Sequence, residues 1–359
     1  MNQNLESYFS ISYEQSKKRW FQEVTRLKAQ ISSFPISAKS PEGKDLAIDF
    51  AIIGDPSSRK VILHVAGTHG IEGFLGAAIQ LAILKDLAQP PKDFALALLH
   101  CLNPWGMSHL RRVTEDNVDL NRNFQFTENS YQGAPEGYRL LDGFLNPKRE
   151  PAHFDKLLFY PQAILAVLKF GFANVKQAIA GGQSEYQKGL FFTGKAKTEN
   201  LKIFENWLKD NLSQATPVFG IEVHSGLGPY GHDTLFTQLA KSDPEFTKLE
   251  SNLGHPLSSD AADESVGFKT IGDLANAIPR VLSPIPCNWI LQEFGTYNNF
   301  AALSSFRIEN MYHHYGNGDL NHWSKCRLME IFNPKDINWR REVVSRGVDL
   351  FKKAVNSNT

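Results

Sequence analysis

The stretch VILHVAGTHGIEGFLGAAIQ, residues 61–80, decides the fold of this chain. Residues 61–66 form a short, continuous apolar run rich in β-branched side chains, which predicts a strand buried on both faces. Residues 74–87 have the length and apolar spacing of a helix. A strand that passes directly into a helix places their connecting turn at the carboxyl edge of an α/β sheet, where ligand crevices form.

The turn between this strand and helix carries His69 and Glu72. An imidazole and a carboxylate in His-x-x-Glu spacing are two zinc ligands of the usual kinds, and they need a third from elsewhere in the chain. The alternative is a polar strand-end turn whose histidine caps the following helix. Because a four-residue pattern is too short to decide between these readings, the rest of the sequence must do so.

The composition bounds the class of protein. The 359 residues are 42% hydrophobic and 21% charged, which is enough for one large core or two modest ones. Lys plus Arg equals Asp plus Glu at 38 each, so no basic field attracts nucleic acid or an anionic membrane. Cys101, Cys287 and Cys326 are too scattered for a disulfide framework or a thiolate metal site. Without an apolar signal core or a membrane-length apolar stretch, we expect a cytoplasmic protein.

Further apolar runs predict the remaining strands of the sheet, at residues 94–102, 217–223 and 288–294. Residues 45–54 alternate and then become apolar, which predicts a strand in a hairpin with the strand at Val61 and hence an antiparallel edge. Helical patterns occupy residues 13–31, 161–180, 198–212 and 339–355. Together these elements predict an α/β fold, a mostly parallel mixed sheet flanked by helices.

Residues 126–197 are rich in aromatic residues and glycine and are too long for a plain connection. We expect them to form an inserted lid or subdomain that borders a pocket, within a single domain that spans residues 1–359.

Each of four predicted strands ends in ionisable residues. The loop HLRRVTEDNVDLNRNF, residues 109–124, follows the second strand, His224 ends the third, and Glu293 lies in the fourth. A charged loop is usually solvated and a strand-end histidine is usually structural. In a mostly parallel sheet, however, these ends share one edge, so the residues are expected to converge on one cleft. A carboxylate in so apolar a strand costs several kcal/mol to bury unless something pairs with it.

Four short motifs carry a resemblance to a known family: HGIE at 69–72, RVTEDNVDLNRNF at 112–124, EVHS at 222–225 and QEFG at 292–295. In this order they resemble the zinc carboxypeptidase superfamily of the carboxypeptidase A type, and its relatives aspartoacylase and succinylglutamate desuccinylase. The resemblance covers about residues 51–297, and NVDLNRNF is its most distinctive part. It is greatest to a bacterial carboxypeptidase-like branch of unassigned function.

The resemblance implies a metal site. His69, Glu72 and His224 would bind one Zn²⁺ per chain and leave the fourth position to water. Asp119 would hydrogen-bond a ligand histidine and fix its tautomer. Glu222 lies two positions before His224 on one strand and so points to the same face. There it would either hydrogen-bond a ligand histidine, as Asp119 would, or act as a rival general base.

The resemblance also implies catalytic and substrate-binding roles. Arg112 would stabilise the carbonyl oxyanion, Asn121 and Arg122 would grip a substrate carboxylate, and Glu293 would be the general base. These roles are physically consistent, because zinc lowers the pKa of its water to about 7, a carboxylate takes the proton, and a guanidinium fork matches a carboxylate.

Two features depart from the family pattern. Carboxypeptidases of this type carry a tyrosine on a mobile loop between the third zinc ligand and the base, but here only Tyr230 lies between His224 and Glu293. It is too close to the ligand, so the tyrosine's role is unassigned. The insertion at 126–197 is also long, which favours a pocket narrowed to a small or unusual amide.

Three functions fit these residues. The first is a zinc-dependent amide hydrolase, a carboxypeptidase-like metallopeptidase acting on a small peptide with a free carboxylate. The second is a zinc deacylase of N-acyl amino acids, which would use the same ligands. The third is a catalytically idle carboxylate-binding protein, which has no need for both Glu293 and an open zinc position. A serine hydrolase is disfavoured, because Ser225 lacks the Gly-x-Ser-x-Gly elbow.

Overall fold

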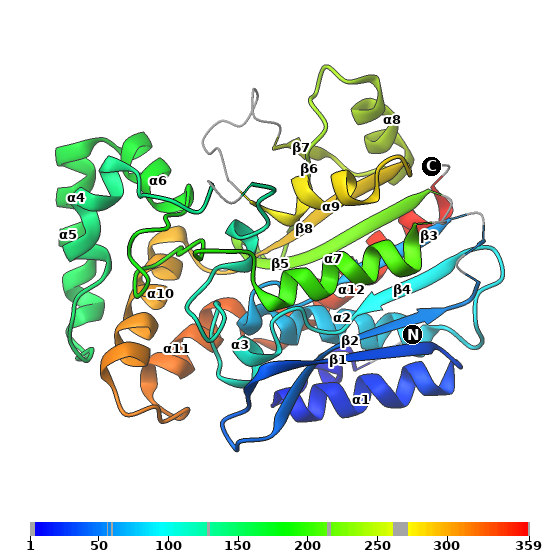
Figure 1. Cartoon of the computed structure of the whole chain (residues 1–359), viewed down its shortest axis with the longest axis horizontal. Coiled ribbons are helices and arrows are strands. Elements are labelled where there is room, and N and C mark those ends of the chain that lie inside the picture. Colours follow the sequence, from blue (N-terminus) through cyan, green and yellow to red (C-terminus); the bar gives the residue numbers. More distant parts are fainter. Residues whose placement is uncertain are drawn as a thin grey trace.

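An eight-stranded mixed sheet runs through the centre of the computed structural model, which describes residues 4–357 apart from 56, 59, 128–129, 214–216 and 261–271 (Figure 1). The strand order is β1-β2-β4-β3-β5-β8-β6-β7, and the four central strands from β4 to β8 are parallel. The predicted mixed α/β sheet is confirmed. The strands are β1 (Gln30–Lys39), β2 (Asp45–Ile53), β3 (Val61–Val65), β4 (Ala95–Leu99), β5 (Val218–Tyr230), β6 (Asp233–Thr237), β7 (Leu257–Ser259) and β8 (Cys287–Gly295).

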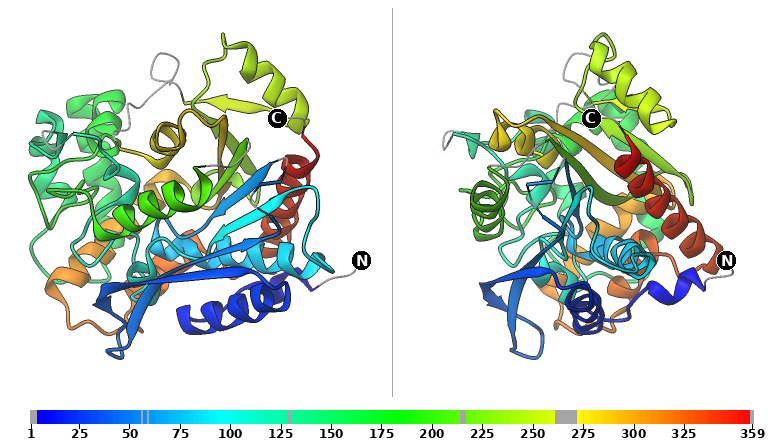
Figure 2. Two further views of the ribbon diagram at one scale, coloured as in Figure 1. Left: turned by 45° about the vertical axis from the view of Figure 1, so that its right-hand side comes forward. Right: turned by 90° about the vertical axis from the view of Figure 1, so that its right-hand side faces the viewer.

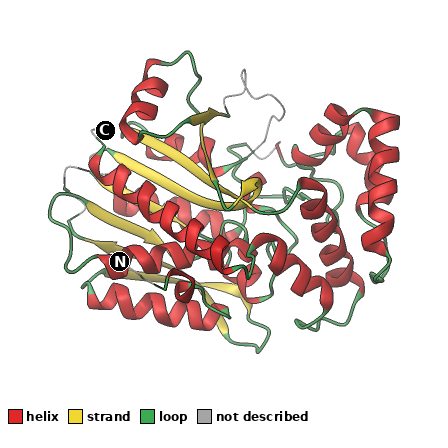
Figure 3. Cartoon of the chain, turned by 180° about the vertical axis from the view of Figure 1, so that it is seen from behind, coloured by secondary structure: helices red, strands yellow, loops and turns green. Residues whose placement is uncertain are grey.

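Helices cover both faces of this sheet (Figures 2 and 3). One core joins the sheet to α1 (Tyr13–Arg26), α2 (Gly73–Asp86), α8 (Pro244–Leu253) and α12 (Ile337–Asn356). The core on the opposite face is made largely with α7 (Glu199–Leu212) and α9 (Leu274–Leu282). The N-terminal half also contains the short helices η1 (Leu5–Tyr8) and α3 (Pro104–Ser108).

The opening stretch folds as predicted. All five residues of β3 are buried, because Leu63 and Val65 pack in one core while Ile62 packs in the other. The chain passes through the short helix η2 (Gly70–Glu72) directly into α2. A Cβ on Gly76 would lie 2.5 Å from the Cβ of Ala66, so only glycine lets α2 pack this closely on the strand. The turn therefore lies at the carboxyl edge of the parallel strands.

The helix predicted over residues 13–31 is too long. Helix α1 ends at Arg26, and Lys28 takes a positive φ of 56°, which a continuing helix does not allow. Gln30 then begins β1, a strand that the sequence analysis missed. Ile31 fits the amphipathic pattern of the helix by coincidence. It packs against the core as a residue of strand β1.

The predicted hairpin between residues 45–54 and the strand at Val61 is wrong. Strand β2 pairs antiparallel with β1 on one side and with β4 on the other, and β4 lies between β2 and β3. The antiparallel edge exists, but β1 supplies it. Pro56, in the segment between the two strands, lies outside the described residues.

The insertion at 126–197 contains three helices, α4 (Glu136–Leu145), α5 (Asp155–Phe170) and α6 (Phe172–Ala180), which project from one end of the molecule (Figure 1). The single helix predicted over 161–180 is thus two, divided at Gly171 with a φ of 79°. The helices share a small core that includes Tyr138, Leu141 and Leu145.

The chain returns beside the insertion in α10 (Asn299–Tyr315) and α11 (Trp323–Phe332), neither of which the sequence analysis identified. The side chain of Arg307 on α10 donates to the carbonyl of Phe144 and to Gln162 Oε1, which joins α10 to α4 and α5. In the part of the chain that the structure describes, no helix is long and apolar enough to cross a membrane.

Candidate metal centre

The turn after β3 is bound to the polar loop that follows β4 and α3. The backbone N–H groups of Gly70 and Ile71 donate to the carbonyls of Arg112 and Arg111 at 3.0 and 2.8 Å. A Cβ on Gly70 would lie 2.2 Å from the backbone of Gly106, so glycine is needed for the two segments to approach. Backbone hydrogen bonds therefore hold the segments that follow β3 and β4 against each other.

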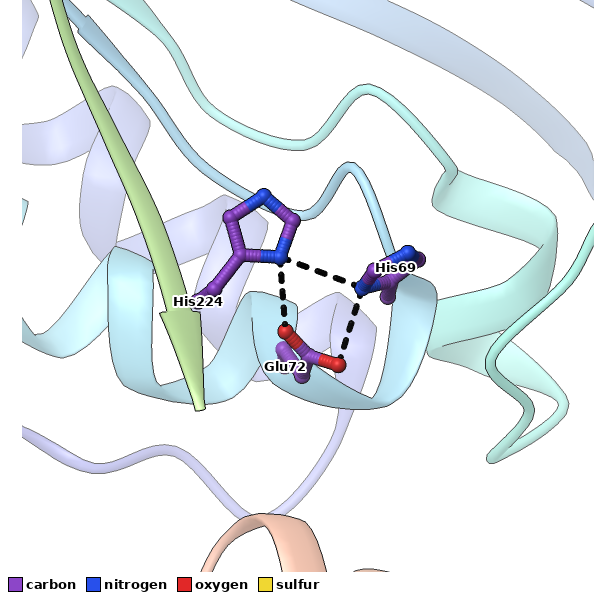
Figure 4. A group of neighbouring side chains, drawn as sticks. All are labelled: His69, Glu72 and His224. Atoms are coloured by element: carbon purple, nitrogen blue, oxygen red, sulfur yellow. Dashed lines mark hydrogen bonds and ion pairs between the residues drawn. The ribbon is translucent and has the colours of Figure 1, made fainter. Parts of the chain in front are cut away.

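Three buried side chains converge at this edge of the sheet (Figure 4). The Nδ1 atom of His69 lies 2.9 Å from Glu72 Oε1 and 3.2 Å from His224 Nδ1, and His224 Nδ1 lies 3.2 Å from Glu72 Oε2. Their ligand atoms all lie within 4.8 Å of one another. Among the described residues, no other group of His, Cys, Asp and Glu meets this description.

The outer nitrogen of each histidine contacts a second carboxylate. His69 Nε2 lies 3.2 Å from Asp119 Oδ1, and His224 Nε2 lies 2.7 Å from Glu222 Oε1. An N–H group held on Nε2 leaves the lone pair of Nδ1 facing the centre, which is the tautomer a metal ligand requires. Asp119 therefore lies where the sequence analysis expected it, and Glu222 serves the second histidine in the same way.

The charges of the site also fit a divalent cation. Three buried carboxylates, Glu72, Asp119 and Glu222, contact one guanidinium, that of Arg112, and the two imidazoles. With neutral imidazoles, these contacts leave more carboxylates than guanidinium groups around the two histidines, which favours a bound cation. A buried excess of this kind is costly unless it is compensated.

The pKa values of the site show the same preference for positive charge. Burial raises the pKa of a carboxyl, but the neighbouring histidines outweigh burial and hold the pKa of Glu72 far below its usual range. Burial lowers the pKa of His224, but Glu222 and Glu72 outweigh it and raise that pKa to about 10. The carboxylates of the site therefore favour a positive charge on His224.

Glu222 is itself held by two side chains that the sequence analysis missed. Thr68 Oγ1 donates to Glu222 Oε1 at 2.8 Å, and the indole Nε1 of Trp289 donates to Oε2 at 3.1 Å. Trp289 lies opposite Gly220 in the sheet register, and a Cβ on Gly220 would fall 2.1 Å from the indole ring. These contacts fully engage Glu222, which favours an orienting role over that of a rival base.

Glu293 lies beside His224, because the two residues are register partners on the parallel strands β5 and β8. Its Oε1 accepts a hydrogen bond from the backbone N–H of Leu227 at 2.9 Å. Burial and the nearby Glu72 raise the pKa of Glu293 to about 7, against the opposing effects of His224, the Leu227 N–H and Arg112. A carboxyl with a pKa near neutrality is suited to accept and return a proton.

Arg112 spans the metal site and a pair of aromatic rings. Its Nε donates to Asp119 Oδ2 at 3.1 Å and its Nη1 to Glu72 Oε1 at 3.3 Å. Its guanidinium carbon lies 4.9 Å from the ring centre of Phe306 and 5.9 Å from that of Phe191. Cation–π contacts of this kind hold the guanidinium plane in place, and Phe306, from α10, had no signal in the sequence that could have indicated the contact.

Comparison with known proteins identifies the family. A family model described as "Protein of unknown function (DUF2817)" matches residues 9–346. The chain belongs to this family. No curated protein matches the sequence. The predicted assignment to a branch of unassigned function is confirmed.

Solved structures similar to this DUF2817 protein include metallocarboxypeptidases and an amidase. Carboxypeptidase A from Helicoverpa armigera is 13% identical over 93% of this chain and 73% of its own, with a TM-score of 0.44. The murein-tripeptide amidase MpaA from Escherichia coli O157 is 14% identical over 80% of this chain and 93% of its own, with a TM-score of 0.36. A Pseudomonas aeruginosa metallo-carboxypeptidase, solved with (2-guanidinoethylmercapto)succinic acid, is 13% identical over 95% of this chain and 71% of its own, with a TM-score of 0.43.

Asn121 and Arg122 belong to the short helix η3 (Leu120–Arg122), which Asp119 caps by accepting from the Asn121 N–H at 3.0 Å. Both side chains are 8% exposed. Asn121 Oδ1 accepts from the backbone N–H of Leu274, and Arg122 Nη1 donates to the carbonyl of Asn121. The same Asp119 side chain contacts His69, so this pair of residues follows directly in the chain after a contact of the candidate metal site.

Tyr230 lies on the last residue of β5, where it is 44% exposed and its ring meets that of Tyr297 edge to face. It contacts none of the three metal-ligating side chains. The role of the family tyrosine therefore remains unassigned in this chain.

Proposed function

We propose that this chain is a zinc-dependent hydrolase of an amide bond in a small, carboxylate-bearing substrate. The observation that carries the proposal is the buried set of His69, Glu72 and His224, whose donor atoms face one another while both outer imidazole nitrogens contact carboxylates. A purely structural cluster does not need a buried glutamate with a raised pKa beside it.

Zinc bound by these three residues would supply electrophilic activation of water and of the scissile carbonyl. Glu293 would take the proton of the attacking water and return it to the leaving amine, because its carboxylate lies beside His224 and has a pKa near neutrality. Arg112 would stabilise the negative charge that develops on the carbonyl oxygen, with Phe306 and Phe191 fixing its guanidinium plane.

Asn121 and Arg122 would bind the substrate carboxylate. A guanidinium pairs with a carboxylate through two parallel hydrogen bonds, and a side-chain amide supplies a further donor. The alternative named by the sequence is that Arg122 only braces the loop against Asp116 or Asp119. Asp119 does stabilise the charge of Arg122, since burial lowers the pKa of this guanidinium while Asp119, Asp273 and Asp260 oppose that effect. Substitution of Arg122 distinguishes this bracing from substrate binding.

Replacement of Arg122 by lysine tests this assignment. Lysine keeps the charge but loses the bidentate fork, so we expect catalytic efficiency on free-acid substrates to fall by roughly 10- to 150-fold, the equivalent of about 1.5 to 3 kcal/mol. The measurement is kcat/KM together with far-ultraviolet circular dichroism, which should be unchanged. Arg139→Lys, at an exposed ion pair with Glu185, is the matched control and should keep full activity.

A comparison of free-acid and amidated substrates tests the same assignment from the substrate side. Amidation of the carboxylate should cost the parent enzyme a similar factor and the Arg122→Lys variant little more. Equal cleavage of free-acid and amidated forms by the parent would show that Arg122 does not read a carboxylate.

The insertion is proposed to limit the length of the substrate. Its final segment packs on the site loop, since Asn117 Nδ2 donates to the carbonyls of Gln187 and Gly189, and the Asp119 N–H donates to that of Phe192. Phe191 in the same segment contacts Arg112. We therefore propose that residues 126–197 border the cleft as a lid.

A screen of the zinc-loaded protein against short peptides and N-acyl amino acids tests the lid and distinguishes a peptidase from a deacylase. We expect turnover of short substrates, with preference for one of the two classes. Rapid trimming of long, structured polypeptides would contradict the lid, and no turnover of either class would contradict the hydrolase proposal.

A further inference from the structure

Helix α5 is largely apolar, yet one of its faces lies in solvent. Phe159, Ala163 and Ala166 are buried. The opposite side of the helix carries seven large apolar side chains that are each 41 to 77% exposed: Phe154, Leu157, Leu158, Tyr160, Ile164, Leu165 and Leu168. We call this surface the α5 face. An apolar helix face is typically covered.

The spacing on the α5 face is that of a helix-pairing seam. Phe154, Leu157, Pro161, Ile164 and Leu168 follow one another at intervals of three, four, three and four residues. This is the repeat of a and d positions in a coiled coil, a narrow stripe suited to one neighbouring helix. None of these seam residues is charged, and the guanidinium of Arg149, which lies 5.6 Å from the ring centre of Phe154, is already paired with the carboxylate of Asp155.

The charges around α5 favour a protein over a lipid surface. An anionic bilayer attracts helices whose apolar face is bordered by a basic cluster. Helix α5 has only Lys156 and Lys169, and the ammonium of Lys156 already lies 4.6 Å from the ring centre of Trp323. The whole chain has a formal net charge of zero at pH 7.

The size of the α5 face matches a stable interface between two proteins. Seven large apolar side chains exposed to this degree present on the order of 800 Å², compared with a few hundred Å² for the largest apolar patch of a typical monomer. A standard interface covers about 800 Å² on each partner. The face is thus as large as one side of a dimer interface.

We propose that the α5 face binds the same face of a second copy of this chain. A two-fold axis across the middle of α5 would pair the helices antiparallel, so that Phe154 and Leu157 of one copy meet Leu168 of the other. The face also lies at the outer end of the molecule, where nothing else in the described chain obstructs a partner (Figures 1 and 3).

Pairing at this face would also brace the proposed active site. The other side of α5 contacts α10 through Gln162 and Arg307, and α10 carries Phe306, which packs on the guanidinium of Arg112. The dimer is proposed from the α5 face alone, however, and does not depend on the proposed hydrolase activity.

Sedimentation velocity of the purified full-length chain over about 1 to 100 μM tests the proposal, because self-association depends on concentration. We expect the parent to have twice the mass of one chain. The variant Leu157→Glu/Leu168→Glu buries two charges in the seam and should weaken the dimer by at least about 100-fold, while its circular dichroism is unchanged because both side chains are exposed. Leu157→Ser/Leu168→Ser removes the same apolar side chains without adding charge, and it replaces the glutamate variant if the charges disturb folding.

The matched control is Ile11→Glu/Ile337→Glu, which adds the same charges at side chains that are 86% and 51% exposed away from α5. It should dimerise like the parent. A monomeric parent throughout the concentration range would overturn the proposal, as would a dimer that survives both α5 variants. A monomeric parent that binds phosphatidylcholine or phosphatidylglycerol vesicles, and loses this binding in the α5 variants, would assign the face to a lipid surface.

Discussion

Replacement of Glu293 by glutamine is expected to lower turnover by about 100- to 10,000-fold, the usual contribution of a general base, while zinc remains bound. Glutamine keeps the shape of the side chain, and its oxygen still accepts from the Leu227 N–H. It cannot take a proton from water. Because Glu293 is not one of the three proposed ligands and keeps its hydrogen bond to Leu227, we expect the ligand set to be undisturbed.

Glu222→Gln is the informative companion. The amide loses the charge that holds His224 Nε2, so we expect zinc affinity to fall by about 10- to 100-fold, as is usual for such partners, with a smaller loss of turnover once zinc is saturating. Zinc content by elemental analysis and kcat at saturating zinc separate the two effects. If Glu293→Gln had almost no effect and Glu222→Gln were inactive with zinc bound, Glu222 would be the general base and Glu293 would not.

Replacement of His224 by alanine is expected to abolish stoichiometric zinc binding and, with it, activity. The change removes one of three ligands and leaves Glu222 buried without its imidazole partner, so the site loses both a donor and its electrostatic balance. Elemental analysis after mild dialysis should find one zinc per chain in the parent and almost none in the variant.

The matched control is His255→Ala. This histidine lies 3.7 Å from Asp233 on β6, two strands away from His224 in the sheet, and it is not one of the proposed ligands, so its removal should leave the zinc content at one per chain. Chelation followed by added zinc should restore activity to the parent and to this control. Full zinc occupancy in His224→Ala would show that the ligand set has been assigned wrongly.

The sequence by itself determined the elements whose signals are local. The run from Val61 to Val65 is apolar on both faces and is followed by a glycine turn and a long apolar helix, so no distant residue was needed to recognise it. The same holds for β4, β5 and β8, and for the polar residues at their ends. Since parallel strands share one edge, the sequence also indicated that His69, His224 and Glu293 would meet.

Only the tertiary structure decided which strands are neighbours. Strand β2 pairs with β1 and β4, because pairing depends on the cross-strand fit of segments far apart in the sequence. The end of α1 was hidden for a related reason: Ile31 fits both a helical stripe and a buried strand face, and only the turn at Lys28 separates the two.

The tertiary structure also decided which partners orient the side chains of the site and offset their charges. The contacts of Trp289 and Thr68 with Glu222, and of Phe306 with Arg112, join residues between 67 and 194 positions apart in the chain. No periodicity encodes such contacts, because they arise only when the sheet and α10 are packed. The sequence determined which chemical groups are present at the strand ends, and the packing of distant segments determined which nitrogen, oxygen or guanidinium each of them faces.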